Sequence, residues 1–263
     1  MKQLKIGSYE LSEEESKRVN EIISKFLVNK HEVLEGFSPK TGRSAAGKQF
    51  CLNVNNIRYV SVKLEWDSPE NILWELFHAN VRQILCMPHY KVIKEKDFPL
   101  PNWKDQEYII MDWGPKDGRF HLADEHVQES LNQNKLILLS QFGNVAAQNY
   151  LFATSDRKKE HFVWDLTDKN LFSIDHEIPT NNADEVTNYF RSELKALNGN
   201  NWYDDEDMKK TFTNSFMIIW QNAEKEQNKI LQNYVQNGLE KYSGGFLERL
   251  KLGSQSALQR VMS

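Results

Sequence analysis

The sequence predicts an α+β fold with a strand-rich first half and a mostly helical second half. Short apolar runs with strand character gather between residues 49 and 111. The run Asp112-Trp113-Gly114-Pro115 then breaks the chain, and beyond it apolar residues recur mostly at helical spacing. Two short apolar runs at 162–165 and 171–174 are the exception, and they indicate one hairpin inside the helical half.

The first predicted helix covers residues 11–35. Ser12 is its candidate N-cap, because Glu15 follows at the spacing of a capping box. Gly36 is expected to end the helix. The apolar stripe that supports this helix consists of Val19, Ile22, Ile23, Phe26 and Leu27.

The strands of the first half flank a second predicted helix. Gln49–Val54 and Arg58–Leu64 are expected to pair through a tight turn at Asn55-Asn56. A helix is expected to begin at Asp67-Ser68-Pro69-Glu70 and to run to about Leu85. Further strands are predicted at Lys91–Lys94 and Glu107–Met111. Beyond the break, helices are predicted at 124–132, 134–153, 183–197, 206–236 and 245–261.

Composition excludes two classes of protein. The chain of 263 residues carries 33 Lys and Arg against 37 Asp and Glu, so a direct nucleic-acid binder that relies on bulk positive charge is not expected. Seven Trp and fourteen Phe exclude a mainly disordered chain. The length allows one large domain or two small ones.

Cysteine usage and the N-terminus predict a cytoplasmic protein. Cys51 and Cys86 are too few for a zinc cluster, and their apolar settings indicate buried thiols in a reducing compartment; one disulfide between them is the alternative. The N-terminal residues are charged and lack the apolar stretch of a signal peptide. The apolar runs are far shorter than a membrane span, so no membrane partner is expected.

Phosphoryl transfer requires a small set of parts, and the chain offers a candidate for each in order. The small residues of Gly42–Gly47 could let backbone N–H groups approach phosphates, and Lys63 ends the strand 58–64. Glu75 follows on the next helix. Asp156 then precedes the predicted hairpin, and Asp175 follows it. Each residue alone is typical of a solvated turn, an edge position or a helix cap. The hypothesis of phosphoryl transfer therefore depends on the order and spacing of all of them together.

The run from Asp156 to His176 resembles the catalytic segment of HipA-like kinases, distant relatives of phosphatidylinositol kinases. The family pattern is Asp-Arg-His-x-x-Asn, a strand, a turn, a second strand and Ile-Asp-His-Gly. Asp156-Arg157 and Ile174-Asp175-His176 match it. The resemblance covers roughly residues 40–180, and the last third of the chain adds nothing specific. It implies a bilobal protein-kinase-like fold, with an N-lobe of residues 1–112 and a helical C-lobe of residues 113–263.

The resemblance also implies a cofactor and a role for each candidate. ATP would be bound together with Mg or Mn. Asp156 would be the catalytic base, and Asp175 would hold the metal. The nucleotide-binding residues would be Gly42, Ser44 and Gly47 over the phosphates, Lys63 on the phosphates, Glu75 as the brace of Lys63, and Met111 at the start of a hinge, Met111–Gly114, whose backbone faces the adenine.

Two departures from the family pattern affect the expected chemistry. His161 stands where the family has a metal-binding Asn, and imidazole suits softer metals than Mg. Glu177 replaces the glycine after Asp-His. The expected function is therefore an ATP-dependent Ser/Thr kinase acting on a protein, and the alternative is a nucleotide-binding pseudokinase that serves a regulatory protein partner. A helical scaffold with accidental motif matches is the third possibility.

Two other features of the sequence are given no functional role. They are a second possible alignment of the catalytic motif and the remaining histidines. Gly143–Asn149 could mimic the catalytic run, but Asn149 lies 26 residues before Asp175, whereas His161 lies 14 before it. Residues 136–152 also have the pattern of one helix. The histidines without ligand spacing are interpreted as surface or packing residues: His31, His78, His89, His121 and His126.

Overall fold

The computed structural model describes residues 3–38, 48–64, 69–122, 124–154, 161–174, 176, 179 and 205–262. The chain forms two compact units, Met1–Ile72 with Tyr90–Arg119, and Leu73–His89 with Phe120–Ser263. The segment 73–89 thus groups with the second unit, and each unit consists of two stretches of chain. The expected division at residues 112 and 113 stays a prediction.

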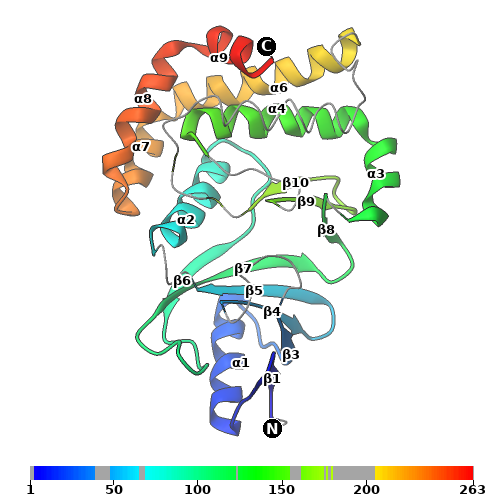
Figure 1. The fold of residues 1–263 in the computed structure, drawn as a ribbon, viewed down its shortest axis with the longest axis vertical. Helices are drawn as coiled ribbons and strands as arrows, with labels where there is room; N and C mark the ends of the chain where they lie inside the picture. Colours follow the sequence, from blue (N-terminus) through cyan, green and yellow to red (C-terminus); the bar gives the residue numbers. More distant parts are fainter. Residues whose placement is uncertain are drawn as a thin grey trace. The chain divides into compact units, whose positions relative to one another are not determined.

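The first unit is built on a seven-stranded sheet (Figure 1). Its strand order is β2-β1-β3-β4-β5-β7-β6, and all neighbours are antiparallel except β1 and β3. The strands are β1 (Lys5–Ile6), β2 (Tyr9–Glu10), β3 (Val33–Phe37), β4 (Gln49–Val54), β5 (Arg58–Leu64), β6 (Val92–Lys96) and β7 (Glu107–Pro115). One apolar cluster joins the sheet to helix α1 (Glu13–Leu27), which buries Val19, Ile23 and Phe26.

Helix α1 begins as predicted but ends earlier than predicted. Ser12 and Glu15 form the expected capping box. Val28 adopts a left-handed conformation with φ of 67°, and the backbone of His31 then bonds to the Ser24 hydroxyl. The predicted helix to residue 35 was therefore wrong in its last turns, because the chain turns back into β3 and pairs with β4.

The β4–β5 hairpin is confirmed with its predicted bounds. Asn55 and Asn56 both have positive φ, 50° and 59°, in the three-residue loop 55–57 that joins the paired residues Val54 and Arg58. Strand β7 is longer than predicted, because its pairing with β5 continues past a bulge to Pro115. Gly114 adopts φ of 89° there, a conformation that glycine tolerates.

The second unit is mainly helical and contains a three-stranded sheet in the order β10-β9-β8. Its longest helices are α2 (Pro69–Ile84), which belongs to this unit from Leu73 onward, α4 (Lys135–Phe152) and α6 (Glu206–Lys225). Among the described residues, no helix has both the length and the apolar character needed to cross a bilayer. The other elements are β8 (Arg119–His121), η1 (Glu125–Val127), α3 (Gln128–Gln133), β9 (Phe162–Asp165), β10 (Leu171–Ser173), α7 (Gln227–Gln236), η4 (Glu240–Tyr242), α8 (Ser243–Leu252) and α9 (Ser254–Met262).

The predicted hairpin and the predicted helix at 134–153 are confirmed as β9–β10 and α4. Because Gly143–Asn149 lies inside α4, the second register of the motif is correctly set aside. The two long C-terminal helices are each divided: α6 and α7 meet at Glu226, and Gly253, with φ of 85°, separates α8 from α9. The predicted helix at 183–197 lies outside the described residues.

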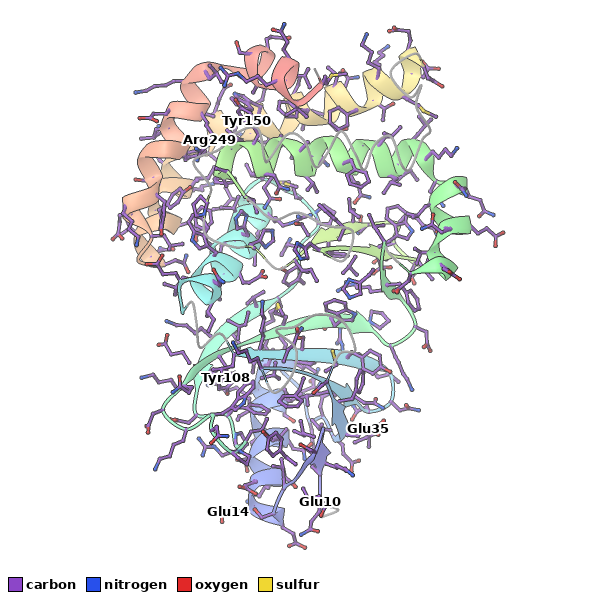
Figure 2. The ribbon with its side chains drawn as sticks, viewed as in Figure 1. Glu10, Glu14, Glu35, Tyr108, Tyr150 and Arg249 are labelled. Atoms are coloured by element: carbon purple, nitrogen blue, oxygen red, sulfur yellow. The ribbon has the colours of Figure 1, made fainter. Side chains whose placement is uncertain are left out.

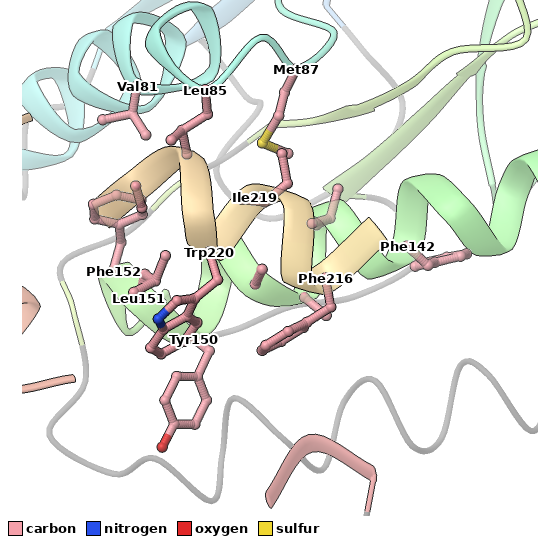
Figure 3. Close-up of a cluster of buried hydrophobic side chains, with 14 of the residues drawn as sticks. Val81, Leu85, Met87, Phe142, Tyr150, Leu151, Phe152, Phe216, Ile219 and Trp220 are labelled. Atoms are coloured by element: carbon pink, nitrogen blue, oxygen red, sulfur yellow. The ribbon is translucent and has the colours of Figure 1, made fainter. Parts of the chain in front are cut away.

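Helices α4 and α6 pack closely in the core of the second unit. Figure 3 shows side chains of α2, α4 and α6 meeting around Trp220 and Ile219. A Cβ atom added at Gly143 would lie 2.4 Å from the Phe212 carbonyl oxygen, so only glycine allows this approach of the two helices. Ser140 and Ser215 bond across the same contact at 2.8 Å.

Helix α8 is linked to the C-terminal end of α4 by Arg249 (Figure 2). The Arg249 Nε donates to the Leu151 carbonyl at 2.8 Å, which satisfies one of the last carbonyls of α4. Burial lowers the pKa of Arg249. A cation at a helix C-terminus is favoured by the helix dipole, which offsets part of this burial.

The two thiols differ in their surroundings, and both are free. Cys51 is half-buried, and burial raises the pKa of its thiol to about 12. Cys86 is exposed, so its predicted burial was wrong. It follows the last turn of α2, where it adopts a left-handed conformation with φ of 57°.

Candidate functional site

Lys63 and Met111 lie on one face of the sheet of the first unit. The apolar cluster beneath α1 takes Val60, Val62 and Leu64 from β5, and Tyr108 and Ile110 from β7. By alternation, Ser61, Lys63, Ile109 and Met111 occupy the opposite face. Lys63 and Ser61 therefore share a face, and the β7 register adds Met111 to that face.

Lys63 stands near the end of β5 and is 9% exposed. It pairs with Gln49, the first residue of β4, and with Ile109 of β7. The run that contains Gly42, Ser44 and Gly47 connects β3 to β4, but those residues lie outside the described part of the chain. In the sequence this run precedes Gln49, the residue of β4 that pairs with Lys63.

Met111 is a buried residue of β7 with partners on both sides, Ser61 in β5 and Val92 in β6. The next residue, Asp112, donates its backbone N–H to Lys91 and accepts a bond from the Arg58 guanidinium at 3.0 Å. The segment expected to be a hinge therefore lies within β7 of the first unit, at the bulge that interrupts its pairing with β5 between Asp112 and Gly114. Its contact with adenine stays a prediction.

Glu75 is a buried carboxylate on α2, and it contacts His176 with both oxygens. Its Oε1 accepts the His176 backbone N–H at 2.9 Å, and its Oε2 lies 3.0 Å from the His176 Nδ1. Each of the two residues is 1% exposed. When Glu75 is ionised its carboxylate only accepts, and the proton of this ring contact then sits on Nδ1. Lys63 belongs to the first unit and Glu75 to the second, so their ion pair stays a prediction.

The His176 ring is also held from two other directions. Its Nε2 lies 3.2 Å from the Ser173 hydroxyl of β10. Its plane stacks on the His78 ring, with centroids 4.0 Å apart and an interplanar angle of 13°. The residue that follows Asp175 in the chain is thus fixed by α2 and by β10.

A second set of hydrogen bonds orients His78. Arg82 can only donate, so its 3.1 Å contact identifies the Gln148 Oε1 as an acceptor. The Gln148 Nε2 then donates to the His78 Nδ1 at 2.8 Å. Arg82 also donates to the Leu171 carbonyl at 3.0 Å and to the Pro88 carbonyl at 2.6 Å. A buried polar chain therefore runs from β10 through α2 and α4 to His176.

Most of these buried hydrogen bonds were not predicted from the sequence, although the spacing of polar residues on α2 indicates them. Glu75, His78 and Arg82 are spaced by three and four residues, which places them on one stripe of the helix. Trp74, Phe77 and Val81 form the apolar stripe beside it. His78 was expected to be a surface or packing residue; it packs on His176 and is also a hydrogen-bonded member of the chain.

His161 is described, whereas the two candidate carboxylates are not. It precedes β9, is 8% exposed, and its carbonyl accepts the Ile174 N–H at 3.0 Å. Within the described residues, no group of three His, Cys, Asp or Glu side chains could hold a metal ion. Asp156, Asp175 and Glu177 lie outside those residues, so the metal role of His161 and Asp175 stays a prediction.

A polar groove of about 820 Å³ lies elsewhere on the first unit. It includes neither Lys63 nor Met111, and therefore it is not the candidate site. Its lining comes from the N-terminal residues 3–4, from α1 and the turn after it, from β3, and from β4 and the β4–β5 turn, and includes Asn20, His31, Glu35, Asn53 and Asn55.

The comparisons with known proteins address the fold. No protein-family model matches the chain, and no curated protein matches it. Among solved structures, the chain is similar to the crystal structure of a proinflammatory kinase, CtkA, of Helicobacter pylori, with a TM-score of 0.54 and 13% sequence identity. The similarity covers 85% of this chain and 95% of that one. The predicted fold class is therefore confirmed, and the chain has a bilobal kinase-like fold.

Proposed function

We propose that the protein is an ATP-dependent phosphotransferase of the HipA-like type, which transfers the γ-phosphate to a Ser or Thr hydroxyl of a protein. The observation that carries the proposal is the common sheet face of Lys63 and Met111 in a kinase-like fold. An ammonium and a strand backbone side by side suit the phosphates and the base of one nucleotide. The match of Asp156-Arg157 and Ile174-Asp175-His176 to the family pattern supports the same function.

In this proposal the nucleotide is bound by residues of the first unit. Lys63 binds the phosphates, and the backbone of Gly42, Ser44 and Gly47 covers them. Met111 and the residues after it face the adenine. Glu75 braces Lys63 when the nucleotide is bound.

The acceptor is activated by residues near the β9–β10 hairpin. Asp156 acts as the base that orients the acceptor hydroxyl. Asp175 and His161 hold a divalent metal, which neutralises phosphate charge when bound. A set of one carboxylate and one imidazole favours Mn²⁺ or another transition metal over Mg²⁺, because Mg²⁺ prefers oxygen ligands.

A nucleotide-binding pseudokinase is the second candidate function. His161 in place of the family Asn and Glu177 in place of glycine favour it, since both changes fall in the metal-binding segment. In that case the protein binds a nucleotide without turnover and acts as a regulatory module for a protein partner.

Radiolabelled ATP with the purified protein distinguishes the two functions. Transfer of label to the protein or to a substrate in Mn²⁺ is the result expected of a kinase. Thermal stabilisation by ATP without transfer would identify a pseudokinase, and the absence of both would leave only a scaffold. Lys63→Met should abolish the ATP response. Lys96→Met is the matched control, because Lys96 is an exposed lysine of β6 in the same sheet.

A further inference from the structure

We propose that Glu75 is a positioning residue that fixes His176, and through His176 the metal-binding residue that precedes it, Asp175. This inference rests on the proposed function, because it assigns the support of the metal ligand. It gives Glu75 a task in addition to bracing Lys63.

The first argument is the geometry of the Glu75 carboxylate. One oxygen accepts the backbone N–H of His176 at 2.9 Å, and the other accepts from its ring at 3.0 Å. A backbone bond and a side-chain bond to the same residue fix both its position and its orientation. The bonds connect residues 101 positions apart in the sequence, so they anchor the segment after β10 to α2.

The second argument is that the partner ring cannot turn. His78 stacks on one face of the His176 ring at 4.0 Å, and the Ser173 hydroxyl meets its Nε2. His78 is itself held by Gln148, which Arg82 holds in turn. Arg82 bonds to the Leu171 carbonyl of β10, so the chain of contacts begins and ends at the segment that leads to Asp175.

The third argument is energetic. A carboxylate that is removed from water loses strong hydration, and an apolar side chain of similar shape at a buried site is often as stable or more stable. Stability alone therefore does not call for a carboxylate beside His176. A charge-assisted bond to a backbone N–H, however, holds a segment more tightly than a neutral one. The immediate neighbour of a metal ligand is where such precision has a catalytic use.

The test compares Glu75→Gln with Glu224→Gln, the same chemical change at an exposed position of α6. Hydrogen exchange of the His176 amide is the first measurement. Glu75→Gln should accelerate it about tenfold, because a neutral acceptor replaces a charged one. The second measurement is the Mn²⁺ dependence of phosphotransfer, in which half-saturation should move about tenfold upward, a typical effect of losing support for a metal ligand. ATP affinity without metal is measured separately, because it reports on the brace of Lys63 and not on the support of Asp175.

His176→Asn and His176→Leu complete the design. Asn keeps an N–H donor near the position of Nδ1 and should retain most of the Mn²⁺ affinity, whereas Leu should lose it. If Glu75→Gln does not fold, this pair tests the same contact. Unchanged exchange in Glu75→Gln, or equal Mn²⁺ affinity of the Asn and Leu variants, would overturn the proposal. A wild-type protein that binds no ATP refutes the proposed function instead, and the exchange measurement still decides whether Glu75 fixes His176.

Discussion

Ser61 and Met111 are direct partners across β5 and β7, and the same register sets Lys63 opposite Ile109. Side chains two positions apart along a strand share a face, so Lys63 and Met111 are diagonal neighbours, about 7–8 Å apart at Cα. Sheet register alone therefore brings together the residue proposed for the phosphates and the segment proposed for the base.

Asp175→Ala should abolish metal-dependent ATP binding while the fold is kept. The expected loss of phosphotransfer is at least about a hundredfold, because several kcal/mol of charge stabilisation depend on the metal. Asp168→Ala is the matched control, since Asp168 is an exposed carboxylate in the β9–β10 turn. Titration of Mn²⁺ and ATP by calorimetry measures the effect, and unchanged binding in Asp175→Ala contradicts its assignment.

His161→Asn should raise Mg²⁺-dependent activity. The change restores an oxygen ligand, which Mg²⁺ prefers, at the position where the family has Asn. Phosphotransfer rates in Mg²⁺ and in Mn²⁺ are compared for the wild type and the variant. A folded variant without any gain in Mg²⁺ would show that position 161 has no metal role, and the pseudokinase function would then be favoured.

Gly143→Ala should destabilise the second unit. The new methyl group would lie 2.4 Å from the Phe212 carbonyl oxygen, so α4 and α6 must move apart. The expected loss is about 1–3 kcal/mol, the usual effect of overpacking. Thermal unfolding followed by circular dichroism measures it.

Gly244→Ala provides the opposite control. Gly244 lies in α8 with no atom within 4 Å of an added Cβ. Alanine should stabilise the helix there by roughly 0.5–1 kcal/mol, because glycine costs more backbone entropy. Equal melting temperatures of the two variants would refute the close packing at Gly143.

The two thiols should react very differently. Exposed Cys86 should be alkylated by iodoacetamide in the native protein, and Cys51 only after unfolding, as mass spectrometry of the labelled peptides can show. The folded pKa of Cys51 is raised from its ordinary value of 9.0 to about 12 by burial. Below pH 9 the resulting stabilisation is fully present. It is lost as the pH rises toward 12, by up to ~1.4 kcal/mol per pH unit, because only the unfolded chain ionises in that range. A Cys51→Ala variant should lack this part of the alkaline loss.

The elements that could be predicted are those with a strong local pattern. The β4–β5 hairpin has two alternating runs and an Asn-Asn turn, and α4 is a long apolar helix. By contrast, β1, β2 and β3 are short strands whose pairing partners define them, and local propensity does not reveal such strands. The last turns predicted for α1 failed for the same reason, because pairing of β3 with β4 overrides helix propensity.

The candidate site could be predicted only in part. The motif pattern named Lys63 and Glu75 as candidates, and their roles stay predictions; it did not reveal the Glu75 contact with His176, which joins residues on α2 and after β10. Such a contact depends on how α2 packs, and no local pattern in the sequence reports it. The polar stripe of Glu75, His78 and Arg82 was the available signal, and it indicated burial of polar groups without naming their partners.

The grouping of Leu73–His89 with the second unit has a consequence for the order in which the chain folds during synthesis. The ribosome releases this segment before β6 and β7 of the first unit, and well before α4 and α6. The sheet of the first unit therefore lacks two strands when α2 emerges, and α2 must keep its apolar stripe unburied until residues beyond 120 arrive. The first unit is complete once Arg119 has been synthesised, but the segment Leu73–His89 inside its sequence must wait for the rest of the second unit, unlike the simple N-to-C order of many multidomain chains. A nascent chain stopped near residue 112 should accordingly expose Trp74, Phe77 and Val81, which makes this segment a target for chaperones.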